Sequence, residues 1–249
     1  MNKSLLRYAA VFTLCCTLFL SGCAVQNMQT KQSNPNAEAL PVLGTIPWTG
    51  HQTASYAIYN SKGEEYGTAR IDTTVDSTAE TCNIQKIKHY KQDETVIESG
   101  ATVATDTLMP RSSYYNKTAP YEKFEVSTKY SDRWEVETKG AKSSSQTVSL
   151  PSTYYDNESL MVILGSISYE VGRTYKLNAT VPLTAGISML KVKCEGTETI
   201  SVPYGDAECF KMSFGETILW FSVDTRILYQ YQDGGSGGIV FKLTGYTAG

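Results

Sequence analysis

The chain has 249 residues and carries 22 lysines and arginines against 25 aspartates and glutamates, a formal net charge of −3 at pH 7. No basic stretch runs along it, so the electrostatic footprint of a nucleic-acid-binding protein is missing and we exclude that class. The 17 tyrosines, together with frequent threonine and valine and few helix-favouring runs, indicate a β-rich fold. A chain of this size can bury a substantial core.

The amino terminus carries the features of an export signal. Lys3 and Arg7 precede an apolar run over residues 8–20, which is shorter than the ~20 residues of a comfortable membrane span. The run closes with Leu20, Ser21, Gly22 and Cys23, a sequence that resembles a bacterial lipobox. The resemblance implies that residues 1–22 are a lipoprotein signal peptide and that the thiol of Cys23 is acylated. An ordinary secretory signal or a core helix is the alternative.

The expected product is a lipoprotein held on a bacterial membrane by lipid on Cys23 and facing away from the cytoplasm. In a cell with two membranes, Ala24 rather than aspartate after the cysteine favours the outer membrane, a rule of the lipoprotein family. Removal of residues 1–22 takes away two basic residues and no acidic ones, so the mature chain has 20 basic and 25 acidic residues and a net charge of −5.

The segment after the cysteine is predicted to be a tether. Residues 23–50 are rich in Asn, Gln, Pro and small residues and have neither a 2.0 nor a 3.6 periodicity. We therefore expect a lipidated N-terminus and flexible tether over 23–50, followed by a single β-rich domain over 51–249. The apolar end of the tether, with Leu40 and Trp48, leaves open whether that end docks on the domain.

Three cysteines stay in the mature chain besides Cys23: Cys82, Cys194 and Cys209. Outside the cytoplasm an odd number suggests one disulfide and one buried thiol, with three free thiols as the alternative. Cys194 and Cys209 are the favoured pair because one hairpin region holds both. A regular hairpin would set them too far apart, so the pair needs a break in the strand near Gly196.

Short alternating segments between turn signals predict an all-β, mainly antiparallel fold. In the clearest case, Trp134 and Val136 alternate with Arg133, Glu135 and Glu137, so one face of the sheet is buried and the other solvated. Later strands are expected at 173–182, 187–195, 197–203, 206–214, 217–223, 226–232 and 239–245. We expect a curved sheet or half-barrel, resembling a β-barrel.

One stretch has helical spacing. After Asp156 as a candidate N-cap, Leu160, Ile163, Leu164 and Ile167 follow at i, i+3, i+4 and i+7, which predicts one short helix. A lone apolar helix in a β-rich chain can act as a plug or lid over the open side of a curved sheet. Ordinary core packing is the alternative.

Several turns and aromatic strands resemble the uncharacterised exported family called domain of unknown function 3108. The similarity lies in Tyr155-Asp156 before the helix, Gly172 and Tyr175, the run from Val202 to Lys211, and the run from Trp220 to Leu228, and it covers about residues 53–232. The resemblance implies an exported β-rich protein similar to the lipoprotein-carrier half-barrels of the cell envelope. It brings no known active site.

No group of residues points to catalysis. His51 at the end of the tether and His89 in a polar strand have no serine or cysteine elbow nearby, and the cysteines lack the paired spacing of a zinc site. Glutamates such as Glu135 and Glu137 are expected on solvated strand faces. We therefore expect no catalytic residue, no metal and no cofactor.

The predicted role is non-catalytic binding, transport or assembly in the envelope, with a lipid or other hydrophobic ligand and envelope proteins as partners. The side chains expected to face an apolar ligand are Phe124, Tyr130, Trp134, Leu160, Ile163 and Trp220. A surface glycan-binding module and a hydrolase with an unrecognised site are the alternatives. The directions in which Tyr114, Tyr115, Trp134 and Trp220 point would separate these functions.

Overall fold

The computed structural model of the protein describes residues 37–43, 46–235 and 238–249. These residues form one sheet of 15 strands with one short α-helix inside its curve, α1 (Leu160–Ile163), followed by the 3-10 turn η1 (Leu164–Ser166). A second 3-10 turn, η2 (Pro182–Thr184), follows β10. The strands are β1 (His51–Tyr59), β2 (Glu65–Asp76), β3 (Thr81–Tyr90), β4 (Val96–Ala104), β5 (Pro110–Ala119), β6 (Glu122–Tyr130), β7 (Arg133–Lys139), β8 (Ser144–Ser149), β9 (Tyr155–Asp156), β10 (Thr174–Val181), β11 (Gly186–Val202), β12 (Gly205–Phe214), β13 (Thr217–Ser222), β14 (Leu228–Gln232) and β15 (Val240–Ala248).

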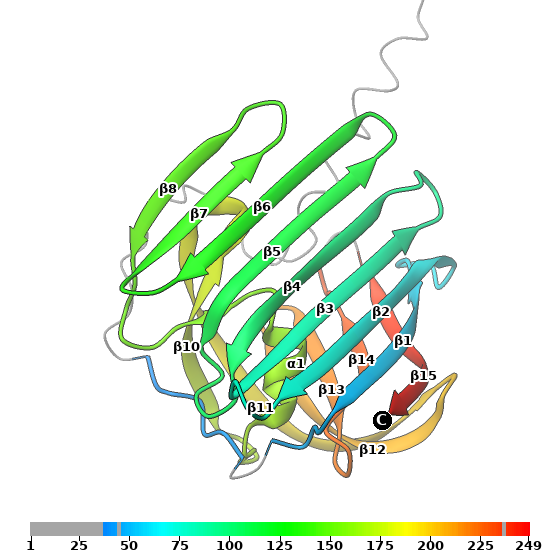
Figure 1. Ribbon diagram of the computed structural model, residues 1–249. Helices are drawn as coiled ribbons and strands as arrows, with labels where there is room; N and C mark the ends of the chain where they lie inside the picture. Colours follow the sequence, from blue (N-terminus) through cyan, green and yellow to red (C-terminus); the bar gives the residue numbers. More distant parts are fainter. Residues whose placement is uncertain (1–36, 44–45, 236–237) are drawn as a thin grey trace, which may run out of the picture.

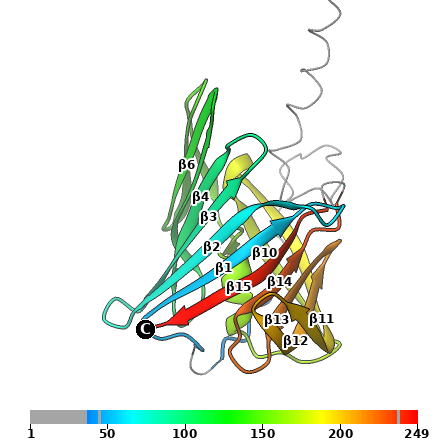
Figure 2. The same cartoon turned by 90° about the vertical axis from the view of Figure 1, so that its right-hand side faces the viewer.

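The sheet bends into two walls around the helix. Its strand order is β8-β7-β6-β5-β4-β3-β2-β1-β15-β14-β13-β12-β11-β10-β9. The wall β1–β8 lies nearest the viewer in Figure 1, β10–β14 lie behind it, and α1 lies between them. Figure 2 shows the walls edge on, joined through β1 and β15. The edges β8 and β9 do not pair, so the sheet stays open.

The predicted fold class is confirmed. All neighbouring strands are antiparallel except β9 and β10, which are parallel. Trp134 and Val136 of β7 point inward and are buried, whereas Glu135 and Glu137 are exposed. The period of two in side-chain direction therefore produces the expected division into a wet and a dry face.

One predicted strand break is wrong. The expected segments 187–195 and 197–203 form a single 17-residue strand, β11. Its pairing with β12 shifts register between Cys194 and Gly196, and Gly196 has a φ of 148°, which favours glycine. The glycine bends the strand without ending it.

The predicted disulfide is not formed. Cys194 lies opposite Met212 and Cys209 lies opposite Glu198, so the two cysteines are about 10 Å apart along the strands at ~3.3 Å per residue, beyond the reach of a disulfide. Cys82, Cys194 and Cys209 are buried free thiols. The register shift at Gly196 does not bring the pair together.

The helix exists but is shorter than its apolar pattern suggests. Ser159, not Asp156, is its N-cap residue, because Asp156 belongs to β9 and pairs with Thr180. All four residues of α1 are buried. A Cβ atom added at Gly165 in η1 would lie 2.3 Å from the carbonyl oxygen of Arg226, so the helix end packs directly on the back wall. Within the described ranges, none of the helices has the length and apolar character that crossing a membrane requires.

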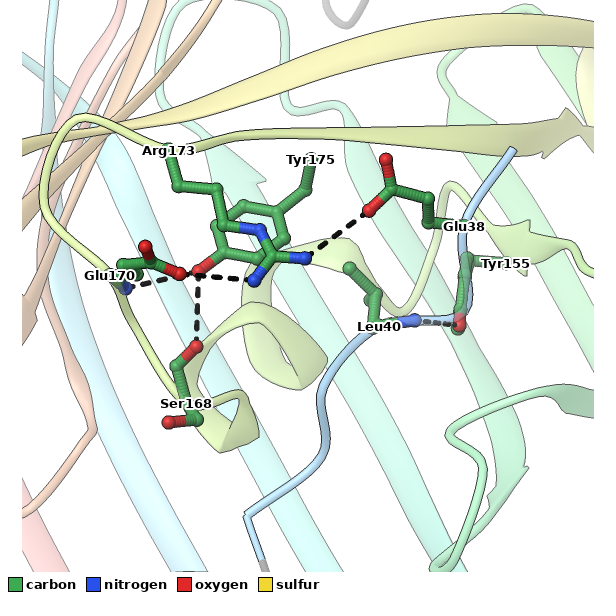
Figure 3. A network of polar contacts seen from close by, with 7 residues as sticks. All are labelled: Glu38, Leu40, Tyr155, Ser168, Glu170, Arg173 and Tyr175. Atoms are coloured by element: carbon green, nitrogen blue, oxygen red, sulfur yellow. Dashed lines mark hydrogen bonds and ion pairs between the residues drawn. The ribbon is translucent and has the colours of Figure 1, made fainter. Parts of the chain in front are cut away.

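The end of the predicted tether belongs to the folded domain. We name residues 38–43 the N-terminal strap. The backbone N–H of Leu40 donates to the Tyr155 hydroxyl at 2.7 Å, and Arg173 forms ion pairs with Glu38 at 3.3 Å and Glu170 at 3.0 Å (Figure 3). Leu40 is buried, and Val42 forms a bridge with Ile167. The signal peptide, Leu20, Ser21, Gly22, Cys23 and the rest of the tether up to residue 36 lie outside the described residues.

Candidate functional site

The space inside the sheet is filled, not hollow. The six side chains expected to face an apolar ligand lie in the core or pack against it, and Trp134 and Ile163 are fully buried. A hollow beside α1, next to Met161 and Val162, measures about 30 Å³, close to the volume of one water molecule. The helix and the aromatic rings occupy the concave side themselves, and the hollow beside α1 is too small for a lipid.

A buried polar cluster also occupies this interior. The ammonium group of Lys86 on β3 lies 2.8 Å from Glu158, and both side chains are almost completely buried. The Tyr130 hydroxyl of β6 donates to Asp156 and lies 2.8 Å from the Thr180 hydroxyl of β10. The cluster of Lys86, Tyr130, Asp156, Glu158 and Thr180 therefore connects the front wall to β9 and β10, near the sheet's open edge.

The ionisation of this cluster is set by burial and by its internal charges. Burial and the neighbouring Glu158 carboxylate raise the pKa of Asp156 to about 6. Burial alone would raise the pKa of Glu158, but the ammonium groups of Lys86 and Lys88 outweigh it and hold that pKa below its ordinary value. Burial and the proximity of Lys86 lower the pKa of Lys88 to about 7. Asp156 has no exposed surface, so the cluster offers a ligand no access.

A hollow of ligand size lies on the outer face of the front wall. We call it the outer trough; its volume is about 760 Å³, within the range of ligand pockets. Its lining comes mostly from outward-pointing positions on the strands β1–β7, the wall that faces the viewer in Figure 1. The lining residues are His51, Thr53, Arg70, Asp72, Thr74, Asn83, Ile84, Gln85, Ala101, Thr102, Ser112, Ser113, Tyr114, Ser127, Thr128, Lys129, Glu135 and Glu137.

The middle of the trough carries an aromatic ring held against the sheet. Tyr114 on β5 lies opposite Gly100 on β4, and a Cβ atom added at Gly100 would lie 3.0 Å from Cε1 of the tyrosine and 2.2 Å from the carbonyl oxygen of Ile84. Only glycine leaves room for the ring to lie over the neighbouring strand. Burial and the nearby Glu98 carboxylate raise the pKa of Tyr114, against a hydrogen bond from Gln85.

One end of the trough is an ordered network of polar side chains. Thr53 donates to Asp72 at 2.6 Å, Arg70 lies 2.8 Å from the other oxygen of Asp72, and a ring nitrogen of His51 lies 2.9 Å from the Thr74 hydroxyl. His51 is the first residue of β1 and joins this network. It therefore belongs to the sheet, and its predicted place at the end of the tether is wrong. His89 is exposed and does not line the trough.

The four aromatic residues singled out in the sequence point in different directions. Tyr114 faces outward into the trough, whereas Tyr115 and Trp134 face the core. Trp220 is buried at the back wall, where its indole N–H donates to Glu198 at 2.5 Å and Lys211 lies over its ring. The direction of Tyr114 could not be predicted from the sequence. Tyr114 and Tyr115 are adjacent, and alternation alone does not say which of the two faces the core. Only the strand register resolves it.

Metal ligands do not gather in the part of the chain that the structure describes: no group of three histidine, cysteine, aspartate or glutamate side chains is placed to hold an ion. The trough carboxylates Glu135 and Glu137 are exposed at neighbouring outward positions of β7. Asp72, the remaining carboxylate of the trough, lies on β2 and is engaged by Thr53 and Arg70.

Comparison with known proteins identifies the fold and the family. A β-barrel-like protein of domain of unknown function DUF1849 from Brucella abortus aligns over 82% of this chain and 100% of its own, with 11% identity and a TM-score of 0.51, and shares the fold. A Bacteroides fragilis NCTC 9343 protein with a YmcC-like fold covers 82% of this chain and 98% of its own at 8% identity, but its TM-score of 0.30 is too low to support an argument. No curated protein matches the sequence. The family model described as "Protein of unknown function (DUF3108)" matches residues 53–244, and the chain belongs to that family.

Proposed function

We propose that the protein is a lipid-anchored extracytoplasmic binding protein without catalytic activity, and that the outer trough is its binding face. The observation that carries the proposal is the position and lining of the outer trough: this hollow of about 760 Å³ lies outside the sheet, while the interior is filled by α1 and aromatic side chains. Its polar lining favours a polar ligand over the hydrophobic one that the sequence suggested.

The proposal that the protein is not an enzyme rests on the positions of its carboxylates. An enzyme acting by general acid catalysis needs a carboxylate with a raised pKa within reach of its substrate. Asp156 is a carboxylate whose pKa is raised to about 6, but it is buried inside the sheet and does not line the trough. The trough instead offers hydroxyl, amide and ion-paired groups suited to binding.

The anchoring is proposed on the lipobox-like sequence and on the place where the folded domain begins. From Cys23 to Glu38 the chain has 15 peptide steps, so a fully extended connection spans at most about 50 Å and a flexible one about 20 Å. A connection of this length would allow the domain to stand off the membrane surface.

The lipid anchor is tested by Cys23→Ala. Stable anchoring requires two or more acyl chains, so we expect the variant to lose acylation and to leave the membrane fraction. Mass spectrometry of the mature N-terminus and fractionation of the cells measure both. An unmodified Cys23 in membrane-extracted wild-type protein would contradict the anchor.

Binding is tested by filling the trough. Ser112 lies on β5 between Thr102 and Lys129, so Ser112→Trp places an indole in the middle of the trough. Thr118→Trp on the same strand and the same outer face is the matched control, because Thr118 is exposed and does not line the trough. The probe is the insoluble envelope fraction of cells that naturally produce the protein, and the protein is the mature chain without lipid.

We expect the wild type and Thr118→Trp to sediment with this fraction and Ser112→Trp to stay in solution. Thermal unfolding of the three proteins checks that the substitutions leave the fold intact. Failure of the wild type to sediment, or equal sedimentation of Ser112→Trp, would overturn the trough as the binding face.

A further inference from the structure

We propose that the ligand of the outer trough is a neutral glycan chain that lies across the strands and stacks on the ring of Tyr114. This inference rests on the proposed binding function and adds the chemical class of the ligand. It is carried by four properties of the trough: its charge balance, its floor, its aromatic platform and its length.

The charge balance of the trough excludes a strongly charged ligand. Its lining contains two positive side chains, Arg70 and Lys129, and three negative ones, Asp72, Glu135 and Glu137, a sum of −1 with His51 neutral. Arg70 is already paired with Asp72. A polyanion would meet no cluster of free positive charge in this lining, and a polycation would meet only two carboxylates at one end.

The floor between these ends is built from neutral hydrogen-bonding groups. Amides and hydroxyls from four neighbouring strands face the trough: Asn83 and Gln85 on β3, Thr102 on β4, Ser112 on β5 and Ser127 on β6. Each can both donate and accept, which matches the many hydroxyl groups of a sugar. Thr102 donates to Asn83 at 2.7 Å, so part of the floor is ordered before any ligand arrives.

Tyr114 supplies the apolar part of such a site. The ring lies over Gly100, and the amide of Gln85 lines the same hollow beside it. A sugar ring presents hydroxyls at its rim and C–H groups on its faces, so it can stack on an aromatic ring while its rim contacts the neighbouring amides. The pairing of one flat ring with neutral amides distinguishes this floor from an ordinary solvated strand face.

The length of the trough points to a chain, not a single sugar. Its lining runs from β1 to β7, and six spacings between strands of ~4.8 Å give about 29 Å along the sheet. An extended peptide is the competing polymer. Peptides that bind sheets gain much of their affinity from a free strand edge, whereas the trough lies on a face whose strands β1–β7 are each paired on both sides.

The class of ligand is tested by destroying one polymer at a time in the insoluble envelope fraction. Periodate cleaves the bond between neighbouring hydroxyl-bearing carbons of sugars, and a protease removes peptides. We expect sedimentation of the mature chain to be lost after periodate treatment, with excess reagent quenched. We expect it to persist after protease treatment and in 0.5 M salt, where the screening length is about half that at physiological salt.

Loss of sedimentation after protease or in high salt, with neither periodate nor glycan-cleaving hydrolases having an effect, would overturn the neutral glycan while leaving the trough as the binding face. The proposed function itself fails separately, through the Ser112→Trp comparison. Tyr114→Ala should weaken binding about tenfold and Tyr114→Phe by less than about threefold, because the ring supplies the stacking. Equal losses in the two variants would overturn the stacking on Tyr114.

Discussion

At the scale of single residues, the interior is controlled by buried charges that sequence patterns do not reveal. Lys86 stands at a strand position whose neighbours Ile84 and Lys88 also point inward. In the sequence, this lysine occupies an inward-facing position where the alternation predicts an apolar residue. Its partner Glu158 is 72 residues away in the chain. The Lys86–Glu158 ion pair forms only when the sheet bends and brings the two residues together, so the sequence alone does not predict it.

The Lys86–Glu158 pair predicts a strong response to loss of one partner. Lys86→Met should destabilise the protein by about 3–5 kcal/mol, because it leaves the Glu158 carboxylate buried without its nearest positive charge. Urea unfolding measures the change. Combining Lys86→Met with Glu158→Leu should recover much of the loss, since the double variant no longer buries the Glu158 carboxylate without Lys86. A loss below about 1 kcal/mol for Lys86→Met would show that the pair contributes little.

Asp156 predicts a specific dependence of stability on pH. Its pKa of about 6 in the folded protein lies above the ordinary value of 3.8, so the folded state binds more protons than the unfolded state between these values. The contribution of Asp156 to stability is therefore fully present below pH 4 and is lost as the pH rises through 6. Glu158, with a lowered pKa, acts in the opposite direction at lower pH.

Asp156→Asn should flatten the pH profile, because an amide does not titrate. The difference between the unfolding free energies of wild type and variant, measured from pH 4.5 to pH 6.5, should change with pH in the direction just given. A constant difference over this range would contradict the raised pKa.

At the scale of elements, period-two alternation predicted most strands because each wall has one wet and one dry face. The later strands appear close to their expected bounds, as in β12 and β13. The N-terminal strap was harder to predict: Leu40 and Val42 have no regular spacing, and their contacts lie with Tyr155 and Ile167, more than 100 residues away. A sequence without periodicity can still dock when distant elements supply the partners.

Docking of the N-terminal strap should depend on the hydroxyl group of Tyr155. Tyr155→Phe deprives the buried N–H of Leu40 of its acceptor and should lower the free energy of unfolding by about 1–2 kcal/mol. Hydrogen exchange at residues 38–43 should accelerate at the same time. Tyr121→Phe is the control, because Tyr121 is 94% exposed. Unchanged exchange in the strap would contradict its docking through Tyr155.

At the scale of the whole molecule, two outcomes of bending the sheet into two walls could not be predicted from the sequence. Whether the concave side is hollow depends on the summed volume of α1, Trp134 and the other aromatic residues. The alternation of apolar and polar residues predicts which side chains face inward, but not whether they fill the space. The outer trough was equally hidden, since Asn83, Gln85 and Ser112 look like any solvated strand face until the twist of the wall brings them to one hollow.

The central claim, that the outer trough binds an envelope component, is tested most directly by hydroxyl-radical footprinting of tyrosines. The mature chain is oxidised with and without the insoluble envelope fraction, and mass spectrometry measures the oxidation rate of each ring. Tyr114 lines the trough, whereas Tyr121 and Tyr204 are exposed at 94% and 43% elsewhere. We predict that the envelope fraction slows oxidation of Tyr114 alone. An unchanged rate at Tyr114 with protection of Tyr121 or Tyr204 would contradict the claim.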